Sequence, residues 1–338
     1  MFNGVNCPVY IIAEIGVNHN GSLQLALESI DRAKQCGANA VKFQTFRTEN
    51  LVTMTAPKAS YQQENSGSNE SQFEMLKKLE LSFTDFKRIR EYCYEKRIDF
   101  ISTPFDDESA EFLYSIDISA FKVGSGDMNN IPFLYKLDQY KLPIILSTGM
   151  SNLEEVNRSL NVIQHSPVVL LHCTSDYPAP LEDVNLLAMK TMEQTFHKNV
   201  GYSDHTKGTE VSVAAVALGA KIIEKHFTLD CSLPGPDHKA SIDPVDFKRL
   251  VDEVRNVELA LGDGKKRCMP SEENTKAIAR KSIVLIKDKK TGDKIIEADL
   301  KMKRPGTGIE PRFYYDVIGK TLKRDVQKDQ LLSWDDLE

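Results

Sequence analysis

Eight short apolar runs, rich in Ile and Val, alternate with longer amphipathic segments between residue 9 and residue 261. The segments between the runs have helical spacing, and the first opens at Ser22, a typical N-cap, and stops at Gly37. Eight strand–helix units in about 260 residues are the number and length of a (β/α)8 barrel. The predicted strands cover residues 9–16, 40–46, 99–105, 120–126, 143–149, 168–173, 199–205 and 221–227.

A doubly wound open sheet is the alternative α/β architecture. Its first strand-to-helix turn usually carries G-x-G-x-x-G, and EIGVNHNG at residues 14–21 lacks that pattern. We therefore predict a (β/α)8 TIM barrel over residues 1–265.

The pattern changes after the barrel. Residues 282–338 give short β-like pieces separated by Gly, Asp and Pro turns, with no long helix. We predict a small mostly-β domain there, joined to the barrel by a polar linker at 266–281. Within the barrel, the connection at 47–83 is unusually long, and connections of that length are often functional. Helical spacing at 70–81 indicates a partly ordered lid.

Charge and composition argue against several classes of function. The net charge is −6, and residues 265–338 hold 18 Lys and Arg against 13 Asp and Glu, a net of +5 that leaves −11 for residues 1–264. The basic residues form no run and lack interleaved aromatic residues, so we expect no nucleic-acid partner. No apolar run approaches the roughly 20 residues of a membrane helix, so we expect no membrane partner. There is no signal-peptide pattern, and the six cysteines form no C-x-x-C pair, which predicts reduced thiols and a cytoplasmic protein.

Polar residues recur where the predicted strands end, and the active site of a TIM barrel lies at the carboxyl ends of its strands. Lys42 and Lys122 lie in otherwise apolar strands, and because a buried unpaired ammonium is costly, each should meet an anion or a carboxylate. Such lysines beside Ser and Thr donors suit a phosphate or carboxylate ligand, with a purely structural pairing to an acidic residue as the alternative. The strand-end set comprises Glu14, Lys42, Gln44, Thr103, Lys122, Ser125, Asp127, Ser147, Thr148, His172 to Tyr177, Asp204, His205, Glu224 and His226.

His205 and His226 end consecutive predicted strands and can therefore be neighbours. Two histidines fall short of the four ligands of a structural zinc site, so an open Mn²⁺ or Mg²⁺ site fits better, although one of them could be structural. We interpret His172 as a hydrogen-bonded core histidine. Cys173 is interpreted as packing, because adjacent residues of a strand point to opposite faces.

A series of motifs then resembles a known family over essentially the whole chain. The motifs are AEIGVNHNGS, AVKFQTF, ISTPFD, KVGSGDMNN, ILSTGM, LLHCTSDYPAP, GYSDHT, EKHFTLD, GPDHKAS and KRPGTGI, in this order. Together they resemble the sialic acid synthases, the phosphoenolpyruvate-dependent N-acetylneuraminate synthase family. The resemblance makes the C-terminal region an antifreeze-like (SAF) domain.

The resemblance implies a reaction in which phosphoenolpyruvate, an N-acetylmannosamine-type sugar and water give a nine-carbon sialic acid and phosphate. It implies a divalent metal on His205 and His226, Mn²⁺ first and Mg²⁺ or Co²⁺ as alternatives, with Glu14 as a catalytic carboxylate. The phosphoenolpyruvate-binding residues would be Lys42, Thr103, Lys122, Ser125 and Ser147. The sugar-binding residues would be Gln44, Asp127, Tyr177, Asp237 and Arg304. Arg304 would come from the other subunit of a domain-swapped homodimer.

Several alternatives stay open at this point. The lid resembles family members that make legionaminic acid, whose sugar substrate would be 2,4-diacetamido-2,4,6-trideoxymannose. Asp127 and Ser175 stand where the sialic acid members often have Glu or Asn. A metal-independent Schiff-base aldolase using Lys122 is an enzyme of another class. A polysaccharide-binding or coat protein that keeps the fold is a non-catalytic interpretation.

Overall fold

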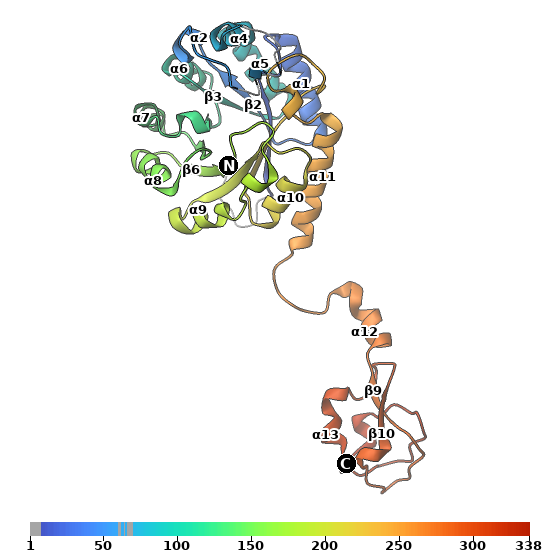
Figure 1. Cartoon of the computed structure of the whole chain (residues 1–338). Coiled ribbons are helices and arrows are strands. Elements are labelled where there is room, and N and C mark those ends of the chain that lie inside the picture. Colours follow the sequence, from blue (N-terminus) through green and yellow to red (C-terminus); the bar gives the residue numbers. More distant parts are fainter. Residues whose placement is uncertain (1–7, 60–61, 64, 66–69) are drawn as a thin grey trace. The chain divides into compact units, whose positions relative to one another are not determined.

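The computed structural model describes residues 8–59, 62–63, 65 and 70–338. The chain divides into two compact units, Met1–Gly262 and Asp263–Glu338 (Figure 1). Within the described residues, no helix combines the length and the apolar character needed to cross a membrane.

The first unit is a closed barrel of eight parallel strands in sequential order, with β1 pairing to both β2 and β8. The predicted TIM barrel is therefore confirmed, and each observed strand lies within the run predicted for it. The strands are β1 (Tyr10–Gly16), β2 (Ala40–Thr45), β3 (Asp99–Pro104), β4 (Phe121–Val123), β5 (Ile144–Ser147), β6 (Val168–His172), β7 (Asn199–Asp204) and β8 (Ile222–His226).

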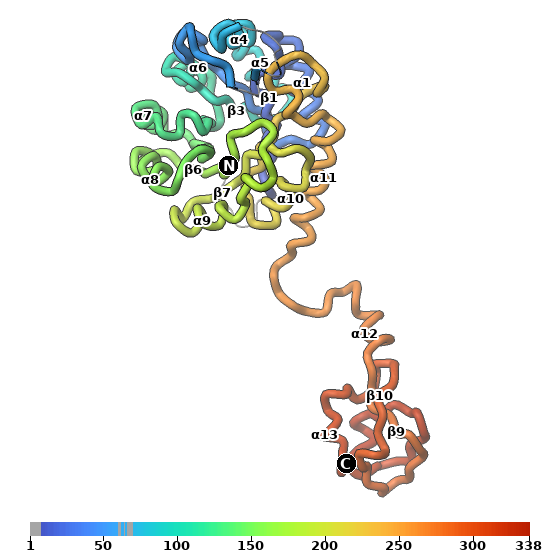
Figure 2. The backbone as a smooth tube through the Cα atoms, viewed as in Figure 1, coloured from blue at the N-terminus to red at the C-terminus, as the bar shows by residue number. Residues whose placement is uncertain are grey.

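Helices surround the strands as an outer ring (Figure 2). The predicted ends of the first helix are confirmed: the Ser22 side chain accepts from the Leu25 amide, and Gly37 adopts the left-handed conformation at φ 94°. The helices are α1 (Leu23–Cys36), α2 (Thr48–Leu51), α4 (Gln72–Leu79), α5 (Phe83–Lys96), α6 (Asp107–Ser115), α7 (Ile131–Gln139), α8 (Leu153–Val162), α9 (Ala188–Phe196), α10 (Glu210–Ala217) and α11 (Pro244–Leu261).

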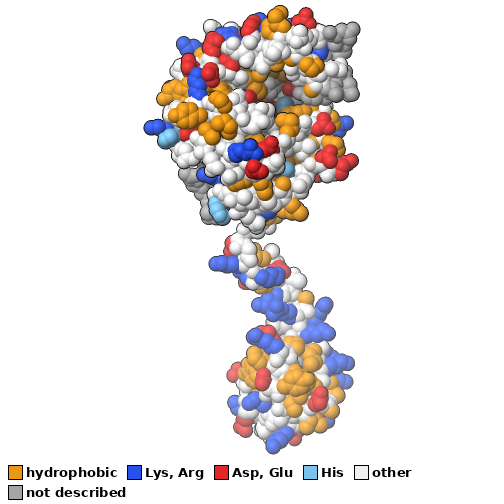
Figure 3. All heavy atoms as spheres, turned by 60° about the vertical axis from the view of Figure 1, so that its left-hand side comes forward, with side chains coloured by type: hydrophobic (Ala, Val, Ile, Leu, Met, Phe, Trp, Pro, Cys, Tyr) orange, Lys and Arg blue, Asp and Glu red, His pale blue; other side chains and the backbone are white. Residues whose placement is uncertain are grey.

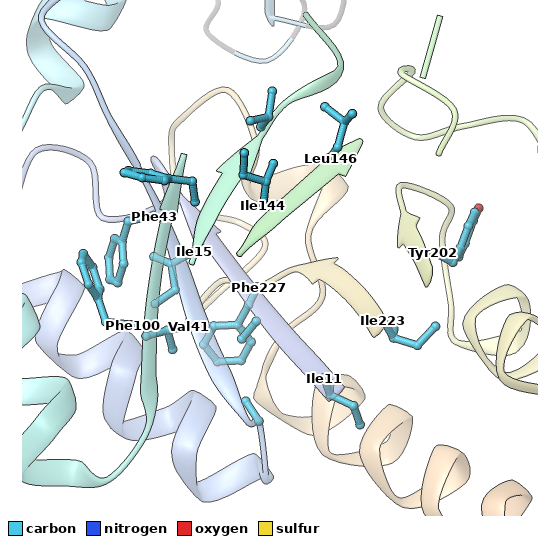
Figure 4. Close-up of a cluster of buried hydrophobic side chains, with 14 of the residues drawn as sticks. Ile11, Ile15, Val41, Phe43, Phe100, Ile144, Leu146, Tyr202, Ile223 and Phe227 are labelled. Carbon is cyan, nitrogen blue, oxygen red and sulfur yellow. The ribbon is translucent and has the colours of Figure 1, made fainter. Parts of the chain in front are cut away.

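Strand alternation divides the core into two layers. One set of side chains, including Ile12, Ile101 and Leu171, forms its own cluster of barrel residues. The alternate residues pack with the helices in a larger cluster, in which Ile11, Phe43, Phe100 and Ile223 are labelled in Figure 4. The polar residues Lys42, Lys122 and Glu224 interrupt this apolar packing within β2, β4 and β8.

The long connection at 47–83 contains helices α2 and α4, so the predicted helical segment is confirmed. The Ser71 side chain and Glu74 form a reciprocal cap at the start of α4. The buried face of α4, with Met75, Leu76 and Leu79, packs beside Val17 and Phe46 at the ends of β1 and β2. Residues 60, 61, 64 and 66–69 of the predicted lid lie outside the described residues.

The second unit has its own small core. Strands β9 (Ser282–Leu285) and β10 (Leu300–Lys303) pair antiparallel, with further isolated bridges, and α13 (Tyr314–Val317) is a single turn. The predicted linker 266–281 includes α12 (Glu273–Ala279). Figure 3 shows Lys and Arg side chains at many places on this unit, in line with its excess of positive charge.

Candidate active site

Two buried lysines and two buried glutamates meet at the carboxyl ends of the barrel strands. Lys42 Nζ lies 2.9 Å from Glu14 Oε2 and 3.7 Å from Glu224 Oε2. Lys122 Nζ lies 3.7 Å from Glu224 Oε1. Both lysines therefore meet carboxylates, as burial requires. Glu224 is the shared partner, and it also accepts from Ser203 Oγ at 2.8 Å.

Hydroxyl and amide groups complete the surroundings of these charges. Lys42 Nζ donates to Thr103 Oγ1 at 3.3 Å, and Lys122 Nζ donates to Ser147 Oγ at 2.6 Å. Gln44 Nε2 donates to Glu14 Oε1 at 3.2 Å. Six of the residues predicted from the strand ends thus lie in one contact network with Glu14. These are Lys42, Gln44, Thr103, Lys122, Ser147 and Glu224.

Burial and the paired charges shift the pKa values of the ionisable groups in this network. Burial, with a smaller contribution from Glu224, raises the pKa of Glu14 despite the attraction of Lys42. Burial also opposes ionisation of Glu224, but Lys122 and Lys42 outweigh it and lower the pKa of that carboxyl. Burial lowers the pKa of Lys122, against the attraction of Glu224. The two ammonium groups are donors from which phosphate or carboxylate oxygens can accept hydrogen bonds.

His205 and His226 lie side by side, with ring centroids 5.6 Å apart. His205 Nδ1 lies 2.6 Å from the Thr174 carbonyl oxygen, so this nitrogen carries the proton and leaves Nε2 unprotonated. The Tyr177 ring lies over His205 at 4.2 Å between centroids. Burial lowers the pKa of His205 to about 4 and that of His226 well below its usual value, so both imidazoles are neutral at pH 7.

The pair meets some of the requirements of a divalent metal site. Metals bind neutral imidazole, and the carbonyl that orients His205 is a typical outer-shell partner. The buried His226 Nδ1 has no hydrogen-bond partner among the described residues. Those residues contain no group of three or more His, Cys, Asp or Glu side chains that could hold a metal. The protein therefore offers two imidazole ligands, and water or substrate would complete the coordination, as in an open site.

Asp237 is a buried carboxylate, 7% exposed, whose side chain accepts no hydrogen bond from the described residues. Burial, and secondarily the charge of Glu14, raises the pKa of Asp237 to about 7. A buried carboxylate that lacks hydrogen-bond donors needs them from a ligand, and sugar hydroxyls can supply them.

The remaining predicted residues of the barrel lie at the margin of this network. Ser125 Oγ accepts from the Gly149 amide at 3.0 Å and lies 3.2 Å from Cys173 Sγ. Asp127, half-buried in the turn after β4, accepts from Asn130 Nδ2 at 3.0 Å. Arg304 is an exposed residue of the second unit.

A cavity of about 900 Å³ borders the site on the side of β5 and β6. Thr148, Cys173, Ser175 and Asp176 line it, whereas the lysine–glutamate network does not. His172 also lines this cavity and is only half-buried, so it is not a core histidine, although the predicted hydrogen bond is present: its Nε2 lies 2.6 Å from the Val184 carbonyl oxygen.

Sequence reasoning placed Glu224 at a strand end but gave it no role. The signal was present, because residues two apart on a strand share a face and Glu224 precedes His226 by two. Ser203 stands in the same relation to His205. Its contact with Glu224 confirms that both residues point into the site.

Comparison with known proteins identifies the family of this chain. The NeuB family model matches residues 29–266, and the SAF domain model matches residues 280–338. The chain belongs to the NeuB family.

Two NeuB relatives are N,N'-diacetyllegionaminic acid synthases, each 45% identical to this chain. The protein from Legionella pneumophila aligns over 99% of this chain and 96% of its own length. The protein from Campylobacter jejuni aligns over 95% and 98%. The crystal structure of N-acetylneuraminic acid synthetase from Leptospira borgpetersenii in complex with citrate superposes with a TM-score of 0.70 at 37% identity, covering 80% of this chain and 90% of that one. NeuB membership makes this chain an enzyme, a sugar acid synthase that uses phosphoenolpyruvate.

Proposed function

We propose that this enzyme condenses phosphoenolpyruvate with an N-acetylated amino sugar of the mannosamine type and water, giving a nine-carbon sugar acid and phosphate. The observation that carries the proposal is the network of Lys42, Lys122 and Glu224 beside the neutral pair His205 and His226. The network suits the anionic substrate, and the histidine pair marks where an aldehyde would be activated.

The sequence motifs left two sugars open, N-acetylmannosamine and 2,4-diacetamido-2,4,6-trideoxymannose. The two relatives that are 45% identical over nearly the full length are named N,N'-diacetyllegionaminic acid synthases, which favours the second sugar. We propose it as the preferred substrate.

The ammonium groups of Lys42 and Lys122 bind the phosphate and carboxylate oxygens of phosphoenolpyruvate, with the hydroxyls of Thr103, Ser125 and Ser147 as donors. Gln44, Asp127, Tyr177, Asp237 and, from the partner subunit of a domain-swapped homodimer, the partner's Arg304 bind the sugar. A divalent metal held by His205 and His226, Mn²⁺ by preference, would supply a Lewis acid that polarises the sugar aldehyde.

The enol carbon of phosphoenolpyruvate forms a carbon–carbon bond to the aldehyde carbon, whose oxygen becomes a hydroxyl. Water adds at C2, and the C–O bond to phosphate then breaks. Glu14, whose pKa burial raises, takes the proton that the water releases and passes it to the new alkoxide, and the proton of the C2 hydroxyl leaves with the phosphate as the ketone forms.

The position of bond cleavage tests this chemistry. In ¹⁸O-labelled water, C–O cleavage predicts label at C2 of the sugar acid before exchange of the product ketone, and unlabelled phosphate by mass spectrometry. Labelled phosphate would mean P–O cleavage and would contradict the proposal. Borohydride added during turnover should trap no Lys122 adduct, which separates this reaction from a Schiff-base aldolase.

A further inference from the structure

The loop that carries Asp237, residues 228–241 between β8 and α11, is anchored by side chains from the loop between β1 and α1. That second loop contains Asn18, His19 and Asn20 of the GVNHNG motif, and the proposed reaction gives none of them a role. Asn18 is 4% exposed. Because the Asn18 amide is buried, its hydrogen bonds to the protein do not compete with hydrogen bonds to water.

Asn18 links the end of β8 to the backbone of Asp237. Its Nδ2 donates to the Phe227 carbonyl at 2.9 Å and to Ser241 Oγ at 2.8 Å. Because the Ser241 oxygen accepts from Asn18, its hydroxyl proton is available, and Ser241 Oγ donates to the Asp237 carbonyl at 2.7 Å. One buried amide thus holds both the residue that follows His226 and the residue proposed to bind the sugar.

Asn20 holds the same loop at two further points. Its Nδ2 donates to the Pro234 carbonyl at 2.9 Å, which fixes the amide orientation and makes Oδ1 the acceptor. His238 Nε2, 3.2 Å away, must then be the donor. His238 Nδ1, unprotonated in this tautomer, lies 2.7 Å from Thr228 Oγ1. Burial lowers the pKa of His238, which agrees with this neutral tautomer.

The packing around these contacts leaves no room for a side chain at position 235. Gly235 has φ 154°, and an added Cβ would lie 2.7 Å from His238 Cδ2 and 2.9 Å from Asn20 Oδ1. On the lid side, Asn65 Nδ2 donates to the Pro236 carbonyl at 2.8 Å. The residues on either side of Asp237 are thus held from two directions while its carboxylate has no partner among the described residues.

We infer that Asn18, Asn20 and His238 are positioning residues for Asp237, and that they determine how well the sugar binds without determining how well phosphoenolpyruvate binds. The inference rests on the proposed function, because it takes Asp237 as a sugar-binding residue. A displacement of about 1 Å in a positioned group can reduce a rate about 100-fold, so loosening the loop has a measurable cost.

The test uses Asn18→Ala, Asn20→Ala and Gly235→Ala in the full chain. Phosphate release gives separate KM values for phosphoenolpyruvate and for 2,4-diacetamido-2,4,6-trideoxymannose. We expect the sugar KM to rise about 10-fold or more while the phosphoenolpyruvate KM stays within about 2-fold. Gly219→Ala is the matched control: Gly219 also has a positive φ, 104°, but an added Cβ meets only Lys190 Nζ at 3.5 Å.

Amide hydrogen exchange of the peptide 228–241, measured without substrates, gives a second readout. Faster exchange in the Asn18 and Asn20 variants, and not in the Gly219 variant, would support the anchoring. Folded variants with unchanged sugar KM and unchanged exchange would overturn it, as would equal increases in both KM values. If the wild-type enzyme releases no phosphate, the proposed function fails, whereas the exchange measurement still tests the anchoring.

Discussion

Lys225 Nζ lies 2.8 Å from Asp204 Oδ2, and the two residues are register partners on β8 and β7. Each directly precedes one of the neighbouring histidines, so the ion pair lies on the opposite face of the strands from the site. Asp204 also accepts from Ser212 Oγ at 2.5 Å and from the Thr206 amide at 2.8 Å. This buried network fixes the two strand ends at the point where His205 and His226 enter the barrel.

Removing one partner of this ion pair should lower the free energy of unfolding. Lys225→Met leaves the Asp204 carboxylate buried and uncompensated, and we expect a loss of about 3–5 kcal/mol of unfolding free energy in urea titrations. The double variant Asp204→Asn/Lys225→Met should recover much of that loss. A single variant as stable as wild type would show that the pair contributes nothing.

The same pair should support metal binding through the histidines. In the folded double variant we expect Mn²⁺ affinity, measured by electron paramagnetic resonance, to fall about 10-fold, because groups that orient ligands have effects of this size. Phosphoenolpyruvate binding should change little. An unchanged Mn²⁺ affinity would mean that the pair contributes to stability but not to metal binding.

Replacing either histidine should separate turnover from folding. His205→Ala or His226→Ala should abolish metal-dependent phosphate release while circular dichroism and the melting temperature stay near wild type. His197→Ala, at an exposed position after α9, is the control and should retain activity. Full activity in His226→Ala would remove His226 from the metal site.

The buried carboxylate of Asp237 should lower the free energy of unfolding at neutral pH. Its pKa is raised to about 7 in the folded protein from the ordinary 3.8, so the folded state binds the extra proton between these values and stability falls as pH rises through that window. At pH 8 the penalty amounts to as much as about 4 kcal/mol.

Asp237→Asn therefore should be more stable than wild type at pH 8, and the difference should vanish below about pH 4. Urea unfolding at several pH values measures this. The same variant should bind the sugar poorly. A stability difference that does not depend on pH would contradict the raised pKa.

The domain-swapped homodimer remains a prediction, and complementation tests it. Arg304→Ala and deletion of residues 282–338 should each remove most activity if the small domain completes a site. After subunit exchange, equal amounts of Arg304→Ala and His226→Ala should regain about a quarter of wild-type activity, since a mixed dimer then holds one intact composite site. No recovery in verified mixed dimers would mean that each site takes both residues from one chain.

The sequence predicted features that depend on local pattern. Short apolar runs rich in Ile and Val located the eight strands, and the capping residues Ser22 and Gly37 located the ends of α1, because these signals act within a few residues. The helix at 273–279 went unrecognised inside a polar segment that lacks an apolar stripe.

The features that sequence reasoning missed depend on closure of the barrel. Glu224 meets Lys42 and Lys122 only because β8 pairs with β1 and the strands enclose a common interior. The hydrogen bond from Asn18 to Ser241 joins residues 223 positions apart. No periodicity within one segment carries that information.

The most direct test of the central claim is phosphate release from phosphoenolpyruvate in the presence of Mn²⁺. The two candidate sugars, N-acetylmannosamine and 2,4-diacetamido-2,4,6-trideoxymannose, would each be supplied with and without EDTA. We predict release that requires a sugar, is faster with the second sugar, and stops on addition of EDTA. Folded enzyme that releases no phosphate with either sugar, or that releases it equally well without any sugar, would contradict the proposed condensation.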